Sequence, residues 1–295
     1  MSDEPELARL TGATLRFRMW VQARYGEQPR FGEWETWYAD WPEIYEAVNA
    51  FVRAEPHAGW GSAAIAMILY LLARDNECEQ IIELIAEDPE RLLFLARAGL
   101  RSTEHDARWQ LADRLGALGD RRDEAEAVLL VFARDSDEYV RRRALMAMVQ
   151  IGSPQVETIA REVWESEVEH ARMATLSALH DVGSPLLGDY LKLAEADGRS
   201  YLLAHVSAIK SEGARESRGS CDPKLAPARL SMSPEASGGV QQAESEQVEV
   251  RAAVHAALEQ LQLVDLAFGL SVAPGLTAGG SYRREVLLQF DGEAA

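Results

Sequence analysis

The feature that most constrains this chain is a stretch that it contains twice. Residues 135–154 read DSDEYVRRRALMAMVQIGSP, and residues 167–185 read EVEHARMATLSALHDVGSP. In both, an Arg stands at the same distance before a Gly, an aliphatic residue precedes that Gly, and the stretch closes on Gly-Ser-Pro. A looser copy lies upstream, around Gly119. Copies about thirty residues apart are typical of helical arrays, in which each copy is one structural unit.

Each copy contains two sets of mostly apolar residues at helical spacing, one before its glycine and one after it. Neither helix can cover its apolar face alone, so stacked neighbours must bury it together. We therefore expect an all-α fold, an α-solenoid of stacked antiparallel helix pairs. The expected core positions of the first helices are Ala107, Leu111, Leu115 and Leu118, then Val140, Ala144, Met148 and Ile151, then Ala171, Thr175, Leu179 and Val182. Those of the second helices are Ala125, Val128, Leu129 and Phe132, then Val156, Ile159, Ala160 and Val163, then Leu187, Tyr190, Leu191 and Ala194.

The residues between the two helices agree with this division. Gly119, Gly152 and Gly183 each follow a first helix, where a left-handed cap is least costly for a residue without a Cβ. In the second and third copies a Ser then offers an N-cap, and Pro fits the first helical position. The pattern predicts a helix, a Gly turn and a second helix in every copy.

These copies resemble the short HEAT-like repeats found in phycobilisome lyases and in many bacterial scaffold proteins. The motif is Val-Arg or Ala-Arg followed by small and aliphatic residues and a Gly turn, as in VRRRALMAMVQIG, ARMATLSALHDVG and, more loosely, ARWQLADRLGALG. It covers residues 104–209, with SYLLAHVSAI as a half-repeat or cap. Thr175 at a core position and Trp109 in place of a small residue depart from the pattern. The resemblance implies an α-solenoid, but such repeats serve many roles.

The resemblance also implies a role for the first Arg of each copy. In HEAT-like arrays this Arg commonly pairs with an Asp or Glu of a neighbouring turn, which would make Arg108, Arg141 and Arg172 a structural ladder. The run Arg141–Arg143 could instead suggest phosphate binding. In a helix, however, its side chains point in different directions, and acidic residues surround them.

Composition divides the chain into five segments. After residue 210 it changes abruptly to Ser, Gly, Pro and Glu without a sustained period, which predicts a flexible linker and a disordered or weakly ordered tail. VEVRAAVHAALEQLQLVDLAFGL, residues 248–270, has the pattern of an amphipathic helix; it could be a docking element or part of a non-native extension from a shifted reading frame. The expected segments are 1–60, a tryptophan-rich cap; 61–103, degenerate helical repeats; 104–210, the HEAT-like array; 211–247, the linker; and 248–295, the tail.

The segments before the array are also expected to be helical. Residues 62–100 predict three helices separated by Asp-Asn and Asp-Pro turns. The stretch DWPEIYEAVNAFVRAEP predicts another, with Asp40 as N-cap, Pro42 in the first turn and Glu43 completing a capping box.

Two features of the first sixty residues leave alternatives open. Residues 14–25 alternate as a strand would, yet a lone strand would lack a partner, so we favour a helix. Five tryptophans could form a recognition surface or the bulky core of a small cap, and we favour the core. They are Trp20, Trp34, Trp37, Trp41 and Trp60.

No catalytic or metal-binding pattern stands out. The histidines include no pair at metal-ligand spacing, and neither cysteine joins a His at zinc spacing. The sequence has no Gly-rich phosphate loop, no nucleophile elbow and no dinucleotide-binding signature. We therefore expect no enzyme activity, no cofactor and no metal.

The formal net charge of −18 constrains the partners. An acidic field repels nucleic-acid phosphates and anionic lipid and attracts basic proteins, although negative charge also simply keeps proteins soluble. The longest apolar run, residues 63–73, is too short to span a bilayer. No secretory signal is visible, and the two cysteines lie far apart. We expect a cytoplasmic protein that binds neither nucleic acid nor membrane.

Together these features favour a non-catalytic interaction module that holds a basic protein on an acidic concave face lined by the second helices. A sharper version is an immunity or inhibitor-type protein that neutralises a basic toxin or enzyme. The alternative, which the resemblance leaves open, is a chromophore lyase or chaperone. The acidic residues expected to contact the partner are Glu124, Glu126, Glu157, Glu162, Glu165 and Asp189.

Overall fold

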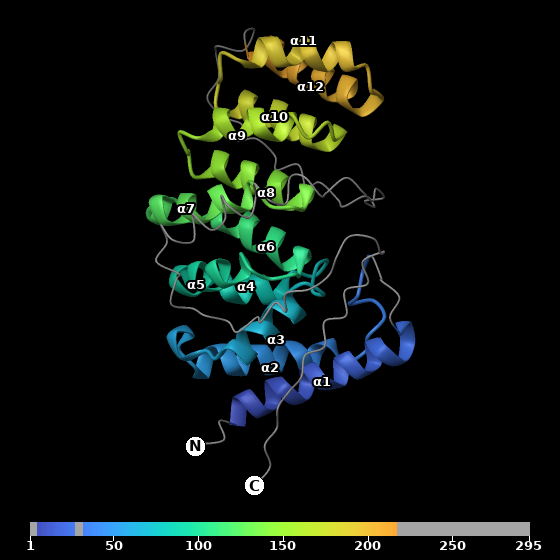
Figure 1. Ribbon diagram of the computed structural model, residues 1–295, viewed down its shortest axis with the longest axis vertical. Helices are drawn as coiled ribbons and strands as arrows, with labels where there is room; N and C mark the ends of the chain where they lie inside the picture. Colours follow the sequence, from blue (N-terminus) through green and yellow to red (C-terminus); the bar gives the residue numbers. More distant parts are fainter. Residues whose placement is uncertain (1–4, 27–31, 217–295) are drawn as a thin grey trace, which may run out of the picture.

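The computed structural model describes residues 5–26 and 32–216, and every regular element in these ranges is a helix (Figure 1). Within them, no helix is both long enough and apolar enough to cross a membrane. Two short 3₁₀ helices, η1 (His57–Gly59) and η2 (Gly119–Arg121), join α-helices. The α-helices are α1 (Pro5–Tyr25), α2 (Trp41–Ala54), α3 (Ser62–Leu72), α4 (Gln80–Ala86), α5 (Pro89–Gly99), α6 (His105–Leu115), α7 (Arg122–Phe132), α8 (Glu138–Gln150), α9 (Val156–Trp164), α10 (Glu169–Asp181), α11 (Leu187–Asp197) and α12 (Ser200–Glu216).

The helices stack in chain order from α1 at one end to α11 and α12 at the other (Figure 1). The first helices of the three copies are α6, α8 and α10, the second helices are α7, α9 and α11, and α12 extends the row of first helices. The expected all-α solenoid is confirmed. The three helices expected over residues 62–100 are α3, α4 and α5.

The two rows of helices are packed differently. α6 packs on α8, α8 on α10, and α10 on α12, whereas α7, α9 and α11 pack mainly against the first helices and have little backbone contact with one another. The first helices therefore form the more closely packed row of the stack. The expectation that the second helices line a concave face stays a prediction.

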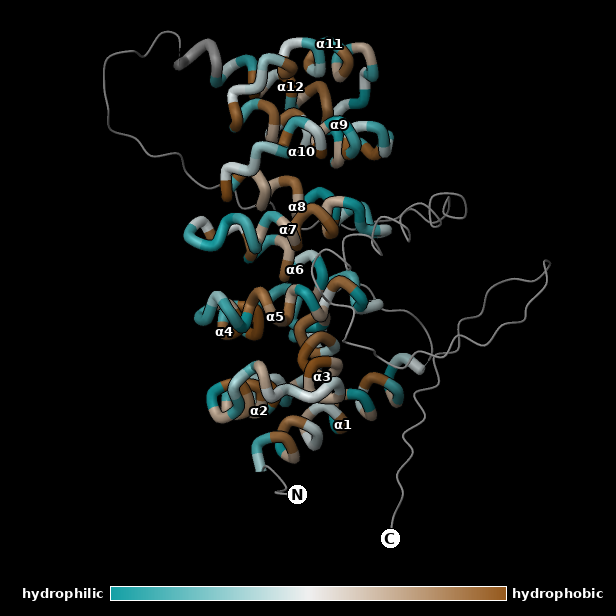
Figure 2. Tube along the Cα trace, turned by 60° about the vertical axis from the view of Figure 1, so that its left-hand side comes forward, coloured by the Kyte–Doolittle hydropathy of each residue, from teal (hydrophilic) through white to brown (hydrophobic). Residues whose placement is uncertain are grey.

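The apolar side chains form one continuous core from α1 to α10 and a smaller one between α9, α10, α11 and α12. In Figure 2 the hydrophobic segments of successive helices face one another along the stack. All expected core positions of α6, α7, α8 and α9 are buried. Thr175 is also fully buried, and its hydroxyl donates to the carbonyl oxygens of Ala160 and Ala171, which explains how a polar side chain fits the core.

The last copy departs from the expected core. Val182 is exposed, and Leu187, Tyr190 and Leu191 are only half-buried, whereas Ala194 is fully buried. The equivalent positions of α7 and α9 lie between two neighbouring units, but α11 has only α12 beyond it. The end of the array therefore lacks part of the cover that the periodicity predicts.

The glycines keep their expected role in two copies. Gly152 and Gly183 have φ of 67° and 63°, in the left-handed region that favours glycine, directly after α8 and α10. Gly119 does not adopt a left-handed conformation, because α6 already ends at Leu115 and Gly119 begins η2. The expectation of a left-handed glycine cap in the first copy is wrong.

The serines after these glycines do not cap the second helices, which begin later than expected, at Val156 and Leu187. Instead, the Ser153 hydroxyl accepts a hydrogen bond from the Gln155 N–H, and Ser184 does the same with Leu186. Both serines are buried and stabilise the turn that precedes the helix.

The ambiguous residues 14–25 belong to α1, so the expectation of a helix is confirmed. Phe17 is fully buried, while Leu15 and Met19 are exposed. The strand-like alternation arises because α1 carries apolar side chains on two opposite faces.

Most of the tryptophans lie in an aromatic core, as favoured. Trp34, Trp41 and Trp60 are buried, and Trp20 is half-buried against the Phe17 ring. Trp37 is the exception, since it is exposed.

The capping box expected for α2 is absent. Asp40 precedes the helix, but its side chain accepts no capping hydrogen bond. Glu43 accepts a hydrogen bond from the Arg16 guanidinium instead, which ties α2 to α1.

At the other end of the stack, α12 continues past residue 210 to Glu216. The linker from residue 217 onward and the tail, including the amphipathic helix expected at residues 248–270, lie outside the described residues.

Candidate binding surface

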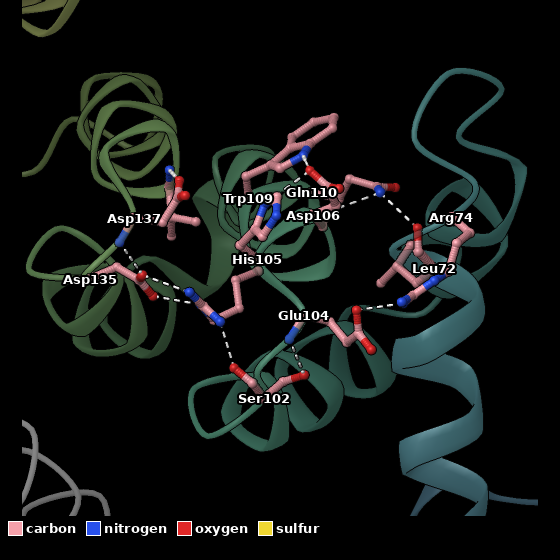
Figure 3. Close-up of polar contacts among 12 residues, drawn as sticks. Leu72, Arg74, Ser102, Glu104, His105, Asp106, Trp109, Gln110, Asp135 and Asp137 are labelled. Carbon is pink, nitrogen blue, oxygen red and sulfur yellow. Dashed lines mark hydrogen bonds and ion pairs between the residues drawn. The ribbon is translucent and has the colours of Figure 1, made fainter. Parts of the chain in front are cut away.

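The first Arg of the array lies in a buried ion pair between repeats. The Arg108 guanidinium donates two hydrogen bonds to the Asp135 carboxylate, at 2.7 and 2.9 Å, and a third to the carbonyl oxygen of Ser102. The two side chains are only 9% and 10% exposed. Figure 3 shows Asp135 and Ser102 on either side of this contact. The bond links α6 to the turn before α8.

Arg172 makes the corresponding contact in the third copy. It pairs with Asp197, the last residue of α11, and its guanidinium lies over the Trp164 ring. Hydrogen bonds from Arg199 and from Arg172 hold the pKa of Asp197 well below its usual range. The carboxylate is therefore charged at neutral pH.

Arg141 differs from the other two. Its guanidinium donates to the carbonyl oxygens of Asp135 and Ser136 and not to a carboxylate. The sequence gives the reason: Asp135 and Asp197 stand three residues before α8 and α12, but Ser166 stands at that place before α10. The second copy therefore lacks the acidic partner that the ladder requires.

The other two arginines of the Arg-Arg-Arg run also bind within the chain. Arg142 pairs with Glu138, and Arg143 pairs with Asp113 and donates to the Tyr139 hydroxyl. All three guanidinium groups of the run are thus held by internal contacts.

Two of the acidic residues expected to face a partner lie inside the array instead. Glu126 accepts a hydrogen bond from the Ser153 hydroxyl, and Glu157 accepts one from Ser184 at 2.6 Å. Both carboxylates are half-buried, and each joins a second helix to the Gly turn of the next copy. The assumption that Glu157 lies freely in solvent is wrong.

Glu124 is also occupied. It bridges Arg97 of α5 and Arg121 of η2, and the hydrogen bond from Arg121 is the main reason why its pKa is lowered.

The remaining expected acids are exposed, on the second helices or directly after one. Glu165, the residue directly after α9, makes no side-chain hydrogen bond or ion pair with any described residue. Glu162 pairs with Arg134 at 2.8 Å, with side chains 43% and 38% exposed, and Asp189 pairs with Lys192 at the surface. Asp123 of α7 is exposed and unpaired within the same ranges, and sequence reasoning missed it although it lies in the first turn of a second helix. We call Asp123, Glu162, Glu165 and Asp189 the outer acids.

A second acidic cluster joins α2 to the turn between α3 and α4. Sulfur and carboxylate oxygens of Glu35, Asp75 and Cys78 lie within 4.8 Å of one another, a spacing that could hold a cation. Both oxygens of the fully buried Asp75 already accept hydrogen bonds, however, from the Tyr45 hydroxyl at 2.8 Å and the Ile81 N–H at 2.6 Å. Burial raises the pKa of Asp75 to about 7. We assign Asp75 a structural role, fastening this turn to α2.

A family model of HEAT repeats matches residues 93–180 and, overlapping them, residues 125–209. No curated protein and no solved structure matches the chain. The matched residues begin within α5 and end within α12, so they coincide with the stacked units described above. HEAT repeats commonly mediate protein–protein interactions, and proteins built from them are generally non-catalytic scaffolds. Residues 93–209 of the chain therefore carry HEAT repeats.

Proposed function

We propose that the chain is a non-catalytic interaction module that binds a basic protein through its outer acids. The observation that carries the proposal is the division of the acidic side chains into two groups. Glu126 and Glu157 are used inside the array and Glu124 is held by two arginines, whereas the outer acids have their charge at the surface, on the second helices or directly after one. A net charge of −18 adds a long-range field that attracts cationic surfaces.

The ion pairs of the outer acids are weak competitors for a partner. Exposed pairs such as Arg134–Glu162 and Lys192–Asp189 contribute about 0–1 kcal/mol, because water and salt screen them. A Lys or Arg of a partner can therefore replace the internal base at little cost. Glu165 has no basic partner to replace among the described residues.

The outer acids therefore favour a protein partner with a cluster of Lys and Arg side chains. Nucleic acid does not fit, because its phosphates would meet carboxylates. An immunity or inhibitor-type role is the sharper form of this proposal, in which the basic partner is a toxin or enzyme that the chain neutralises.

The test is affinity purification from the native host with three versions of the full chain. The first is the wild type, and the second is Glu162→Lys/Glu165→Lys. The control is Glu46→Lys/Glu87→Lys, which changes the net charge equally but lies on α2 and beside α4, where both acids form exposed ion pairs.

We expect a basic protein to co-purify with the wild type and with the control variant and to be lost with the α9 variant. Equal capture by all three versions, or a captured partner without a basic surface, would show that the outer acids do not bind the partner.

A further inference from the structure

Both ends of the stack present apolar side chains to solvent. On α12, Tyr201 and Leu203 are 62% and 37% exposed among the small or polar residues Ser200, Ala204, Ser207 and Ala208. Tyr201 and Leu203 stand two residues apart and therefore lie on different sides of their helix. At the other end, α1 exposes Leu15 and Met19, which are 52% and 71% accessible and stand four residues apart, on one side of the helix. Only α1 therefore combines its exposed large apolar side chains into one face without a cover in the described residues.

The uncovered face of α1 is a continuous strip. Ala8, Gly12, Leu15 and Met19 follow one another at spacings of four, three and four residues, which places them on one side of a helix. α1 packs on α2 and α3 with its opposite side. Spacings of this kind form the seam between two helices that pack side by side.

Gly12 is the residue of this strip that the fold itself does not explain. A glycine within a helix costs about 0.5–1 kcal/mol relative to Ala. A Cβ at Gly12 would meet only the flexible end of the Arg16 side chain, at 3.4 Å, and the backbone there is not left-handed. Nothing within the chain requires a glycine at this place, whereas the close approach of a second helix from outside would.

We propose that the α1 strip packs against the same strip of a second copy, in an antiparallel two-fold dimer. The strip has two small residues in its N-terminal half and two large ones in its C-terminal half. An antiparallel pair centred between Gly12 and Leu15 places Leu15 against Gly12 of the second copy, and Met19 against its Ala8. The strip is therefore complementary to itself, as an interface between identical patches must be.

The charges beside the strip favour this occupant. Arg9 pairs with Glu46, and Arg16 pairs with Glu43, so each of these two basic residues beside the strip is neutralised by an acid of α2. Paired charges of this kind do not repel a second copy at short range. The net charge of −18 does repel at long range, and salt screens that repulsion. Salt therefore strengthens this dimer, whereas it weakens binding of a basic partner to the outer acids.

The expected association is weak. A pair of single helices lies at the low end of interface areas, where complexes are transient. Sedimentation equilibrium of the full chain should therefore show a mass that rises with concentration from that of the 32.6 kDa monomer towards that of a dimer.

The decisive comparison is Leu15→Glu with Leu193→Glu. Leu193 of α11 is 51% exposed, so the two substitutions change equally accessible leucines at opposite ends of the stack. We expect Leu15→Glu to abolish the concentration dependence and Leu193→Glu to keep it. Gly12→Leu should abolish dimerisation while raising the thermal stability of the monomer, since it removes a helix glycine. A glycine with a merely structural role would give the opposite change in stability.

Three results would overturn the proposal. The first is a monomeric mass at every concentration and salt. The second is equal weakening by both glutamate substitutions. The third is a change in the amide hydrogen exchange of α1 on Leu15→Glu that is the same at every protein concentration. Such a change would mean that another segment of the same chain covers the strip.

Discussion

The pair Arg108–Asp135 and the pair Arg134–Glu162 have the same chemistry but different surroundings. The first joins α6 to the turn before α8 with both side chains about nine-tenths buried. The second joins the turn after α7 to α9 with both side chains more than a third exposed. Removing one partner leaves a buried charge without compensation in the first case and a hydrated charge in the second. The burial of each pair therefore determines whether its charge holds the array together or is available to a partner.

The same distinction runs through the acidic residues of the array. Asp135, Asp197, Glu126 and Glu157 hold one unit to the next, and the outer acids do not. Changing one member of each group should therefore have different effects on stability.

The largest effect is expected from Arg108→Ala. It leaves Asp135 buried and unpaired, which typically costs about 3–5 kcal/mol. The matched change at the surface, Arg134→Ala, should cost at most about 1 kcal/mol. Urea denaturation of both variants measures the difference, and similar losses would mean that burial does not separate the two pairs.

The next effect concerns pH and the buried Asp75. Its pKa in the fold is about 7, above the ordinary value of 3.8, because burial penalises the charged form. The folded state therefore binds the proton more strongly than the unfolded chain, and the contribution of Asp75 to stability is full below pH 3.8 and is lost as pH rises to about 7. The free energy of unfolding of the wild type should fall over this range relative to Asp75→Asn. A difference between the two proteins that does not change with pH would contradict the assignment.

Much of the fold could be predicted because it is local. The spacing of Val140, Ala144 and Met148 requires only that a helix bury one face, and all three are buried. The prediction of a left-handed Gly119 was wrong because α6 ends one turn earlier than expected. Where a helix ends depends on tertiary packing as well as on local sequence. The exposure of Val182 also could not be predicted, because periodicity does not indicate where an array stops.

A smaller effect is expected at the contact between Glu157 and Ser184. Ser184→Ala leaves the half-buried carboxylate without its donor, which should cost about 1–2 kcal/mol. Glu165→Gln changes an acid whose side chain makes no bond with a described residue. The free energy of unfolding of this variant should stay within about 0.5 kcal/mol of the wild-type value. Thermal denaturation separates them, and a loss with Glu165→Gln as large as that with Ser184→Ala would show that Glu165 also supports the array.

The sequence contained a signal for this contact that sequence reasoning did not use. Glu126 precedes Ser153, and Glu157 precedes Ser184, by the same interval. A polar pair that recurs with the repeat is expected to join neighbouring units. The cluster around Asp75 has no such signal, because Glu35 and Asp75 meet only once the chain is folded.

The smallest stability change is a gain. Ser166→Asp puts a carboxylate at the place that Asp135 and Asp197 occupy before α8 and α12, where it should pair with Arg141. We expect a stabilisation of about 1 kcal/mol, the worth of one added hydrogen bond. No change in the denaturation midpoint, with the fold retained, would mean that the ladder position is not equivalent in the second copy.

The most direct test of the account is the salt dependence of binding. The dissociation constant of the co-purified partner is measured at rising salt for the wild type, for Glu162→Lys/Glu165→Lys and for Ser166→Asp. We predict that salt weakens wild-type binding, that the double variant binds far more weakly and with less salt dependence at unchanged stability, and that Ser166→Asp binds like the wild type. Loss of stability in the double variant, or binding indifferent to both salt and charge reversal, would contradict the division between charges that hold the array and charges that face a partner.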